Sequence, residues 1–82
     1  MWMPVYRLAH THQAAECSVA YASWKGGDSP LRGEVAVTSC LRGRHEVWWD
    51  VTAGSAEAAL ARLPRFVRER TVIARVGDVV IP

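Results

Sequence analysis

Residues 34–52, EVAVTSCLRGRHEVWWDVT, carry the clearest structural pattern in the chain. Two runs of β-branched and aromatic residues flank Arg42-Gly43, a pattern that predicts a β-hairpin with a glycine turn. If Arg42-Gly43 is a two-residue turn, the antiparallel register sets Val37 opposite Trp48. Each face of the second strand carries a tryptophan, as expected of a central strand covered on two sides. The hairpin therefore predicts strands over 34–40 and 45–52.

The residues before the hairpin predict a strand followed by a helix. Residues 5–9, VYRLA, are rich in strand formers and run into a polar segment that contains two histidines. From Gln13 onward, the apolar positions Ala14, Cys17, Tyr21 and Trp24 recur every three or four residues, so we expect them to share the buried face of a helix. The helix should end at Gly26-Gly27.

The residues after the hairpin predict a second helix and a last strand. Ser55 is placed to cap a helix over 56–63, which should end or bend at Pro64. After a basic stretch, residues 71–76 form the last strand, with a short extension over 78–82.

The resulting order, βαββαβ, predicts a ferredoxin-like α+β fold, in which two helices cover one face of a four-stranded antiparallel sheet. The 82 residues make a single domain, 1–82, because half that length rarely supports a core. The other sheet face stays open, so we expect two copies to pair through their open faces as a homodimeric α+β barrel.

Composition and charge exclude several classes of protein. Half of the residues are hydrophobic and 22% are charged, which is typical of a globular chain. The net charge is only +2, with the arginines scattered, which argues against nucleic acid as a partner. The N-terminus lacks the charged region followed by an apolar region that a signal peptide needs, and no apolar run approaches the length of a membrane span. We therefore expect a cytoplasmic protein whose two cysteines are thiols or metal ligands, although a Cys17–Cys40 disulfide remains open.

The C-terminal half carries a family resemblance. From the alanine-rich helix through Leu63-Pro64-Arg65-Phe66-Val67 to the strand 71–76, the chain resembles muconolactone isomerase-like and related small α+β-barrel proteins. It also resembles small ferredoxin-like actinobacterial proteins, some of which bind nickel. The resemblance implies the βαββαβ frame and a dimeric barrel, and it carries over no catalytic residue.

The topology predicts a metal site at one end of the sheet. His10 and His12 follow the first strand, and the hairpin register sets Cys40 opposite His45 at that same end. Imidazole and thiolate suit Zn²⁺, Ni²⁺ or copper, so we predict His10, His12, Cys40 and His45 as metal ligands, with no organic cofactor. Cys17 shares its helix face with aromatic residues, and we assign it to the core.

A different class of function uses the same end of the sheet. In a cofactor-free isomerase or cyclase, His10 or His45 would move a proton on a small apolar substrate. The residues that would contact this ligand are Tyr6, Tyr21, Trp24, Trp48 and Trp49.

Two further alternatives concern macromolecular partners. The RNA-recognition motif shares the βαββαβ order, but aligning Arg42-Gly43 with its signature sets Arg44 and Glu46 where stacking aromatics are needed. RNA binding is therefore disfavoured, and a non-catalytic structural or interaction module stays open.

Overall fold

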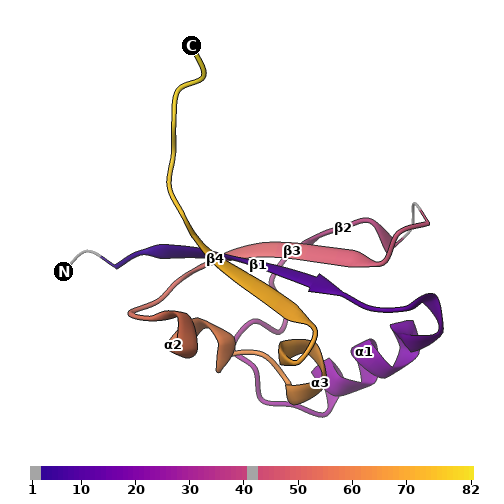
Figure 1. The fold of residues 1–82 in the computed structure, drawn as a ribbon. Helices are drawn as coiled ribbons and strands as arrows, with labels where there is room; N and C mark the ends of the chain where they lie inside the picture. The colour runs from indigo at the N-terminus through magenta and orange to yellow at the C-terminus, as the bar shows by residue number, and fades with distance from the viewer. Residues whose placement is uncertain (1–2, 41–42) are drawn as a thin grey trace.

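The computed structural model describes residues 3–40 and 43–82 of the chain. Its elements, in chain order, are the strand β1 (Val5–Thr11), a 3-10 turn η1 (Ala14–Glu16), the helix α1 (Cys17–Lys25), the strands β2 (Val37–Thr38) and β3 (Glu46–Thr52), the helices α2 (Ala56–Leu60) and α3 (Arg65–Arg68), and the strand β4 (Thr71–Val76). The fold is α+β (Figure 1).

The four strands form one open antiparallel sheet in the order β2-β3-β1-β4. The two central strands are β1 and β3, with Leu8 opposite Trp49 and His10 opposite Val47. In the hairpin, Val37 pairs with Trp48, which confirms the register predicted from the sequence. The turn residue Arg42 lies outside the described residues.

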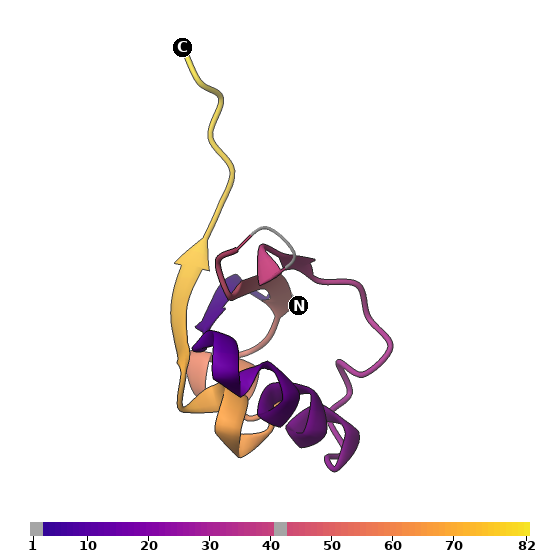
Figure 2. The same ribbon diagram turned by 90° about the vertical axis from the view of Figure 1, so that its right-hand side faces the viewer.

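The helices cover one face of the sheet and leave the other face open (Figures 1 and 2). Alternate residues of β1 point to the helices, and Tyr6, Leu8 and His10 are buried while their neighbours are not. Leu8 and Val67, on β1 and α3, are fully buried at the centre of the core. The fully buried part of the core is small, because Trp24, Trp49 and Phe66, which pack against it, are only partly buried.

Capping residues set the ends of the helices much as the sequence predicts. The Ser55 hydroxyl accepts a hydrogen bond from the Ala58 amide at 3.1 Å and starts α2. The helix α1 ends at Lys25, with Gly26 as its C-cap, as expected.

Several expected details are wrong. The helix stripe that includes Tyr21 is not the buried face of α1, because Tyr21 is 72% exposed and Ala20 is the buried residue. The strand expected over 34–40 is reduced to Val37–Thr38, and residues 77–82 form no strand. The helix after Ser55 stops at Leu60, and the basic stretch after Pro64 forms the short helix α3 because Pro64 can begin a helical turn but cannot continue one.

A candidate metal centre at one corner of the sheet

Three turns of the chain meet at one end of the central strands. The amide of His12, just after β1, donates to the carbonyl of His45, just before β3, at 3.0 Å. The amide of Thr11 donates to the carbonyl of Arg70 at 3.1 Å, which ties the same corner to the start of β4. The short turn η1 then brings α1 to this corner, so that its first residue, Cys17, lies beside the two histidines.

Two histidines and two cysteines form a compact cluster at this corner. One ligand atom from each of His12, Cys17, Cys40 and His45 lies within 4.8 Å of all the others. The Sγ atom of Cys17 is 3.1 Å from Nε2 of His12 and 3.0 Å from Nδ1 of His45. The Sγ atom of Cys40 is 3.8 Å from the same Nε2 of His12. Both cysteines are free thiols.

These separations fit a tetrahedral metal ion. With metal–sulfur bonds of about 2.3 Å and metal–nitrogen bonds of about 2.0–2.1 Å, neighbouring nitrogen and sulfur ligands lie about 3.6 Å apart. The contacts of 3.0 to 3.8 Å bracket this value. Side-chain rotation would lengthen the shortest contacts and shorten the widest separations, which reach up to 4.8 Å, until all four atoms surround one ion.

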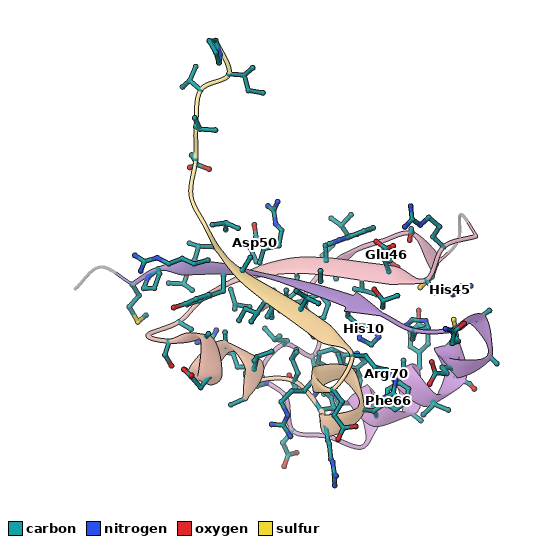
Figure 3. All side chains as sticks on the ribbon, in the orientation of Figure 1. His10, His45, Glu46, Asp50, Phe66 and Arg70 are labelled. Carbon is teal, nitrogen blue, oxygen red and sulfur yellow. The ribbon has the colours of Figure 1, made fainter. Side chains whose placement is uncertain are left out.

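His10 lies behind His12 and fixes its orientation. The side chain of His10 points from β1 toward the helix layer (Figure 3) and is 2% exposed. Its Nδ1 is 3.3 Å from the carbonyl of Val67, and its Nε2 is 2.9 Å from Nδ1 of His12. A carbonyl only accepts, so Nδ1 of neutral His10 carries the proton and Nε2 accepts from Nδ1–H of His12. Because His12 carries its proton on Nδ1, its Nε2 atom is unprotonated, and this atom faces the thiols of Cys17 and Cys40.

Burial keeps the two histidines in the form that metals bind. Burial lowers the pKa of His10, and the nearby His12 lowers it further. Burial also lowers the pKa of His12, as does the neighbouring His45. Burial raises the pKa of the Cys17 thiol, and the adjacent Cys40 adds to this effect. Without a metal, burial therefore favours the neutral forms of His10 and His12 and the protonated thiol of Cys17.

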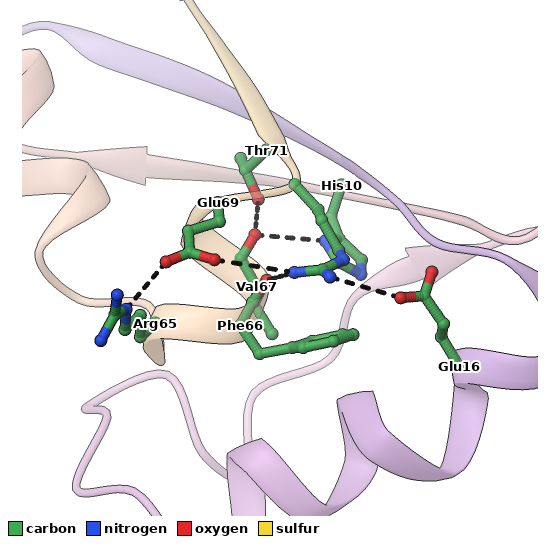
Figure 4. A network of polar contacts seen from close by, with 8 residues as sticks. His10, Glu16, Arg65, Phe66, Val67, Glu69 and Thr71 are labelled. Carbon is green, nitrogen blue, oxygen red and sulfur yellow. Dashed lines mark hydrogen bonds and ion pairs between the residues drawn. The ribbon is translucent and has the colours of Figure 1, made fainter.

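A polar network anchors the start of α1 beside the cluster (Figure 4). The guanidinium of Arg70 lies over the Phe66 ring, 3.7 Å from its centroid, and donates to the Phe66 carbonyl at 3.1 Å. It also pairs with the carboxylate of Glu16 at 3.3 Å. The same carboxylate group accepts from the Gln13 amide at 2.9 Å and closes η1. Because Glu16 directly precedes Cys17, this network holds the thiol in place.

A cleft of about 730 Å³ lies between the sheet, α1 and the loop 31–36, and His12 and Cys40 are part of its lining. Three of the predicted ligand-binding aromatics, Tyr21, Trp24 and Trp49, line it. Trp24 and Trp49 meet edge to face with centroids 6.1 Å apart. The Nε1 atom of Trp49 is buried and has no hydrogen-bond partner in the described part of the chain.

The other two predicted ligand-binding aromatics lie elsewhere. Tyr6 packs in the core of the domain. Trp48 points to the open face of the sheet, where it lines a shallow hollow with Arg7 and Asp50. Neither contributes to the large cleft.

Of the four predicted metal ligands, His12, Cys40 and His45 lie together, whereas His10 contacts the cluster through His12. Cys17, which sequence reasoning assigned to the core, takes the fourth place because η1 turns the chain before α1 begins. One signal in the sequence could have found it. His12 and Cys17 are separated by four residues, and so are Cys40 and His45, so that the four residues form two equally spaced pairs.

No known protein family, curated protein or solved structure matches this chain. None of the helices in residues 3–40 and 43–82 has the length and hydropathy needed to span a bilayer.

Proposed function

We propose that this protein is a small metal-binding domain that holds one transition-metal ion through His12, Cys17, Cys40 and His45. The observation that carries the proposal is the mutual approach of the four ligand atoms, all within 4.8 Å of one another. The hydrogen bond from His12 to the buried His10 supports it, because metal-ligating histidines usually direct their second nitrogen to such a partner.

Zinc is the metal that this donor set fits best. Two thiolates and two imidazoles in a tetrahedral arrangement are typical of Zn²⁺, whereas Ni²⁺ and Cu²⁺ favour square-planar or tetragonal sites. Four protein ligands complete the tetrahedral shell, which is the pattern of a structural ion and not of a catalytic one with an open position.

The ion would stabilise the fold by joining segments far apart in sequence. His12 follows β1, Cys17 begins α1, and Cys40 and His45 flank the hairpin turn. A domain of 82 residues typically has a free energy of unfolding on the order of 4–12 kcal/mol. Zinc at a thousand times its dissociation constant adds about 4 kcal/mol, which is a large share of that total.

A nucleophilic role for Cys17 is less well supported by the same geometry. Its contact with His12 has the arrangement of a cysteine–histidine pair, in which a thiolate attacks a substrate. Burial raises the pKa of Cys17, however, and a reactive cysteine needs a lowered pKa.

A second candidate function is the binding of a small apolar molecule in the cleft beside the cluster. The edge-to-face pair of Trp24 and Trp49 in the lining of the cleft favours a ligand with an aromatic or aliphatic body. A proton-transfer reaction on such a ligand would use His10 or His12, which both line the cleft. Titration with small aromatic acids and lactones, followed by tryptophan fluorescence, tests this candidate. Failure to saturate in the millimolar range would exclude it.

The experiment that tests the metal proposal compares three proteins after purification without a histidine tag. Zinc content is measured by elemental analysis, and the Co²⁺-substituted forms are measured by absorption spectroscopy. The wild type should bind one Zn²⁺, and its Co²⁺ form should show the intense visible bands of a tetrahedral site with sulfur ligands. Cys17→Ser should lose both signals. His10→Gln is the matched control, because His10 is outside the predicted ligand set, and it should keep the tetrahedral spectrum.

Two results would contradict the proposal. A wild type that binds neither Zn²⁺ nor Co²⁺ would exclude the metal site. If His10→Gln loses the cobalt spectrum while Cys17→Ser retains it, the proposed set of ligands is wrong. The affinities of Ni²⁺ and Cu²⁺ relative to Zn²⁺ can be compared with the general order for divalent metals. If either ion binds more tightly than that order predicts, the site is a metal site but zinc is not its metal.

The proposal extends to the fold and its setting. The strand order, with α1, α2 and α3 on one sheet face, supports a ferredoxin-like domain, and its open face supports a homodimer. Free thiols as metal ligands favour the reducing cytoplasm as the compartment in which it acts.

A further inference from the structure

The two cysteines of the cluster lie close enough to each other to form a disulfide. Their Sγ atoms are within 4.8 Å of each other, and both lie near the same Nε2 atom of His12, at 3.1 Å for Cys17 and 3.8 Å for Cys40. A disulfide bond is about 2.05 Å long, so the two sulfur atoms would have to approach by less than about 3 Å. The bond would join the start of α1 to the segment that follows β2.

The two cysteines are held with different firmness. Cys17 is the first residue of α1, and the ion pair between Glu16 and Arg70 anchors that end of the helix. Cys40 follows β2, a strand of two exposed residues at the edge of the sheet, with β3 as its neighbour. The amide of Cys40 donates to the Thr38 hydroxyl at 3.1 Å, a bond within the same short segment. Short edge segments with few buried contacts open locally at low free-energy cost, so Cys40 is the residue that can move toward Cys17.

The two thiols also differ in how they are reached from the cleft of about 730 Å³ beside the cluster. Among the described residues, the lining of the cleft includes Cys40 but not Cys17. Cys17 instead contacts two imidazole rings, with its Sγ atom 3.1 Å from Nε2 of His12 and 3.0 Å from Nδ1 of His45. A small oxidant that enters the cleft therefore meets Cys40 first. Cysteines that sense oxidants are typically accessible and have a second cysteine beside them, which is the arrangement here.

From these positions we infer that Cys17 and Cys40 are a redox pair that a small hydroperoxide oxidises to a disulfide, and that this oxidation releases the metal ion. The thiolate of Cys40 attacks the hydroxyl oxygen of the peroxide, the O–O bond breaks, and the leaving oxygen takes up a proton. The thiolate of Cys17 then attacks the sulfenic acid formed on Cys40. The S–S bond forms, and the sulfenic oxygen leaves as water with a second proton. The two sulfur atoms together lose two electrons, which the peroxide gains. The two protons come from the thiols in the metal-free protein and from water in the metal-bound protein.

This inference rests on the metal site proposed above and adds its regulation. A thiolate is the form of cysteine that binds a metal ion, and oxidation to a disulfide removes both thiolates. The cluster then keeps only His12 and His45 as ligands, so it releases the ion. The disulfide joins the same two segments that the ion joined, and we expect the oxidised chain to stay folded. Transient disulfides of this kind are typical of redox-sensing cysteines in a reducing compartment.

Oxidation by hydrogen peroxide, with and without bound Zn²⁺, tests the inference in three proteins. In the metal-free wild type, one disulfide within the chain should form, which lowers the mass of the single chain by about 2 Da. In the zinc-bound wild type, a chromophoric chelator should record about one equivalent of Zn²⁺ released for each disulfide, and a dithiol reductant should restore zinc binding. Cys17→Ser should accumulate a sulfenic acid on Cys40, which a dimedone probe labels. Cys40→Ser is the matched control, and the probe should label it at least about tenfold more slowly.

The metal-free protein separates this inference from the metal proposal, because disulfide formation needs no ion. A wild type that binds Zn²⁺ but forms no disulfide, or forms one only between two chains, would overturn the redox pair and leave the metal site standing. A wild type that forms the disulfide but binds no Zn²⁺ would overturn the metal site and the release of its ion. Zinc retained after complete oxidation would overturn the release alone. Faster labelling of Cys40→Ser than of Cys17→Ser would overturn the assignment of Cys40 as the thiol attacked first, and circular dichroism checks that both variants fold.

Discussion

Replacing His10 with leucine tests how the protein prepares His12 for a metal ion. Leucine is similar in size and apolar, so it fills the buried position but removes both ring nitrogens. The Val67 carbonyl keeps a partner, because the Thr71 hydroxyl donates to it at 2.6 Å (Figure 4). The loss therefore falls on Nδ1–H of His12, which no longer has an acceptor at 2.9 Å.

The expected effect follows from this single lost contact. Removing the partner that orients a metal-bound histidine typically lowers metal affinity about 10- to 100-fold, or about 1.4–2.7 kcal/mol. His12 would also become free to carry its proton on Nε2, the atom that faces Cys17. His10→Gln should restore most of the affinity, because an amide offers one donor for Val67 and one acceptor for His12.

Two measurements check the reasoning together. Competition with a chromophoric chelator gives the Zn²⁺ dissociation constants of the wild type, His10→Leu and His10→Gln. Long-range nitrogen–proton NMR of the metal-free proteins reports which nitrogen of His12 carries the proton. In the wild type and in His10→Gln the proton should be on Nδ1, and in His10→Leu a mixture of both forms should appear.

The reasoning is refuted if His10→Leu binds Zn²⁺ within about threefold of the wild type. It is refuted equally if the Co²⁺ spectrum of His10→Leu shows that a ligand has been lost, because His10 would then be a metal ligand and not a positioning residue.

Three further predictions concern stability. Leu8→Ala, at a fully buried position, should lower the free energy of unfolding by about 2–5 kcal/mol in urea denaturation, and a loss below about 1 kcal/mol would mean that the core lies elsewhere. Ser55→Ala removes the cap of α2 and should cost about 1 kcal/mol, whereas Ser55→Asp, which keeps an acceptor for the Ala58 amide, should cost little. The hydrogen bonds from Arg7 lower the pKa of Asp50, so their contribution is present above the unfolded carboxyl pKa of about 4 and is lost as the pH falls through the lower folded value. Because both side chains are about half exposed, Asp50→Asn should cost less than about 1 kcal/mol, and that cost should vanish at acid pH.

The sheet and the capped helices follow from local sequence patterns. The register of Val37 with Trp48 could be predicted because two β-forming runs flank Arg42-Gly43, and a short connection leaves two antiparallel strands little choice of pairing. The strand Thr71–Val76 and the Ser55 cap could be predicted for the same reason, since each depends on neighbouring residues. The convergence of His12, Cys40 and His45 then required only the strand order.

The roles of His10 and Cys17 depend on contacts that no local pattern contains. From the sequence, His10 was predicted to be a metal ligand and Cys17 to be a core residue, whereas in the structure Cys17 joins the cluster and His10 lies behind it. Two tertiary features decide the matter. One is the Val67 carbonyl on α3, which engages His10 from the helix layer. The other is η1, which turns α1 so that Tyr21 is exposed and Cys17 faces the histidines.

The order of the strands, the hairpin register and the end of the sheet where histidines and cysteines gather could all be predicted from the amino-acid sequence. These properties depend on turns, caps and alternation, which act over a few residues. The packing of the folded chain sets which four side-chain atoms meet, which histidine contacts another, and which apolar side chains stay uncovered. Those outcomes depend on distances of a few ångströms between segments that lie far apart along the chain, and the packing of the helices on the sheet sets such distances.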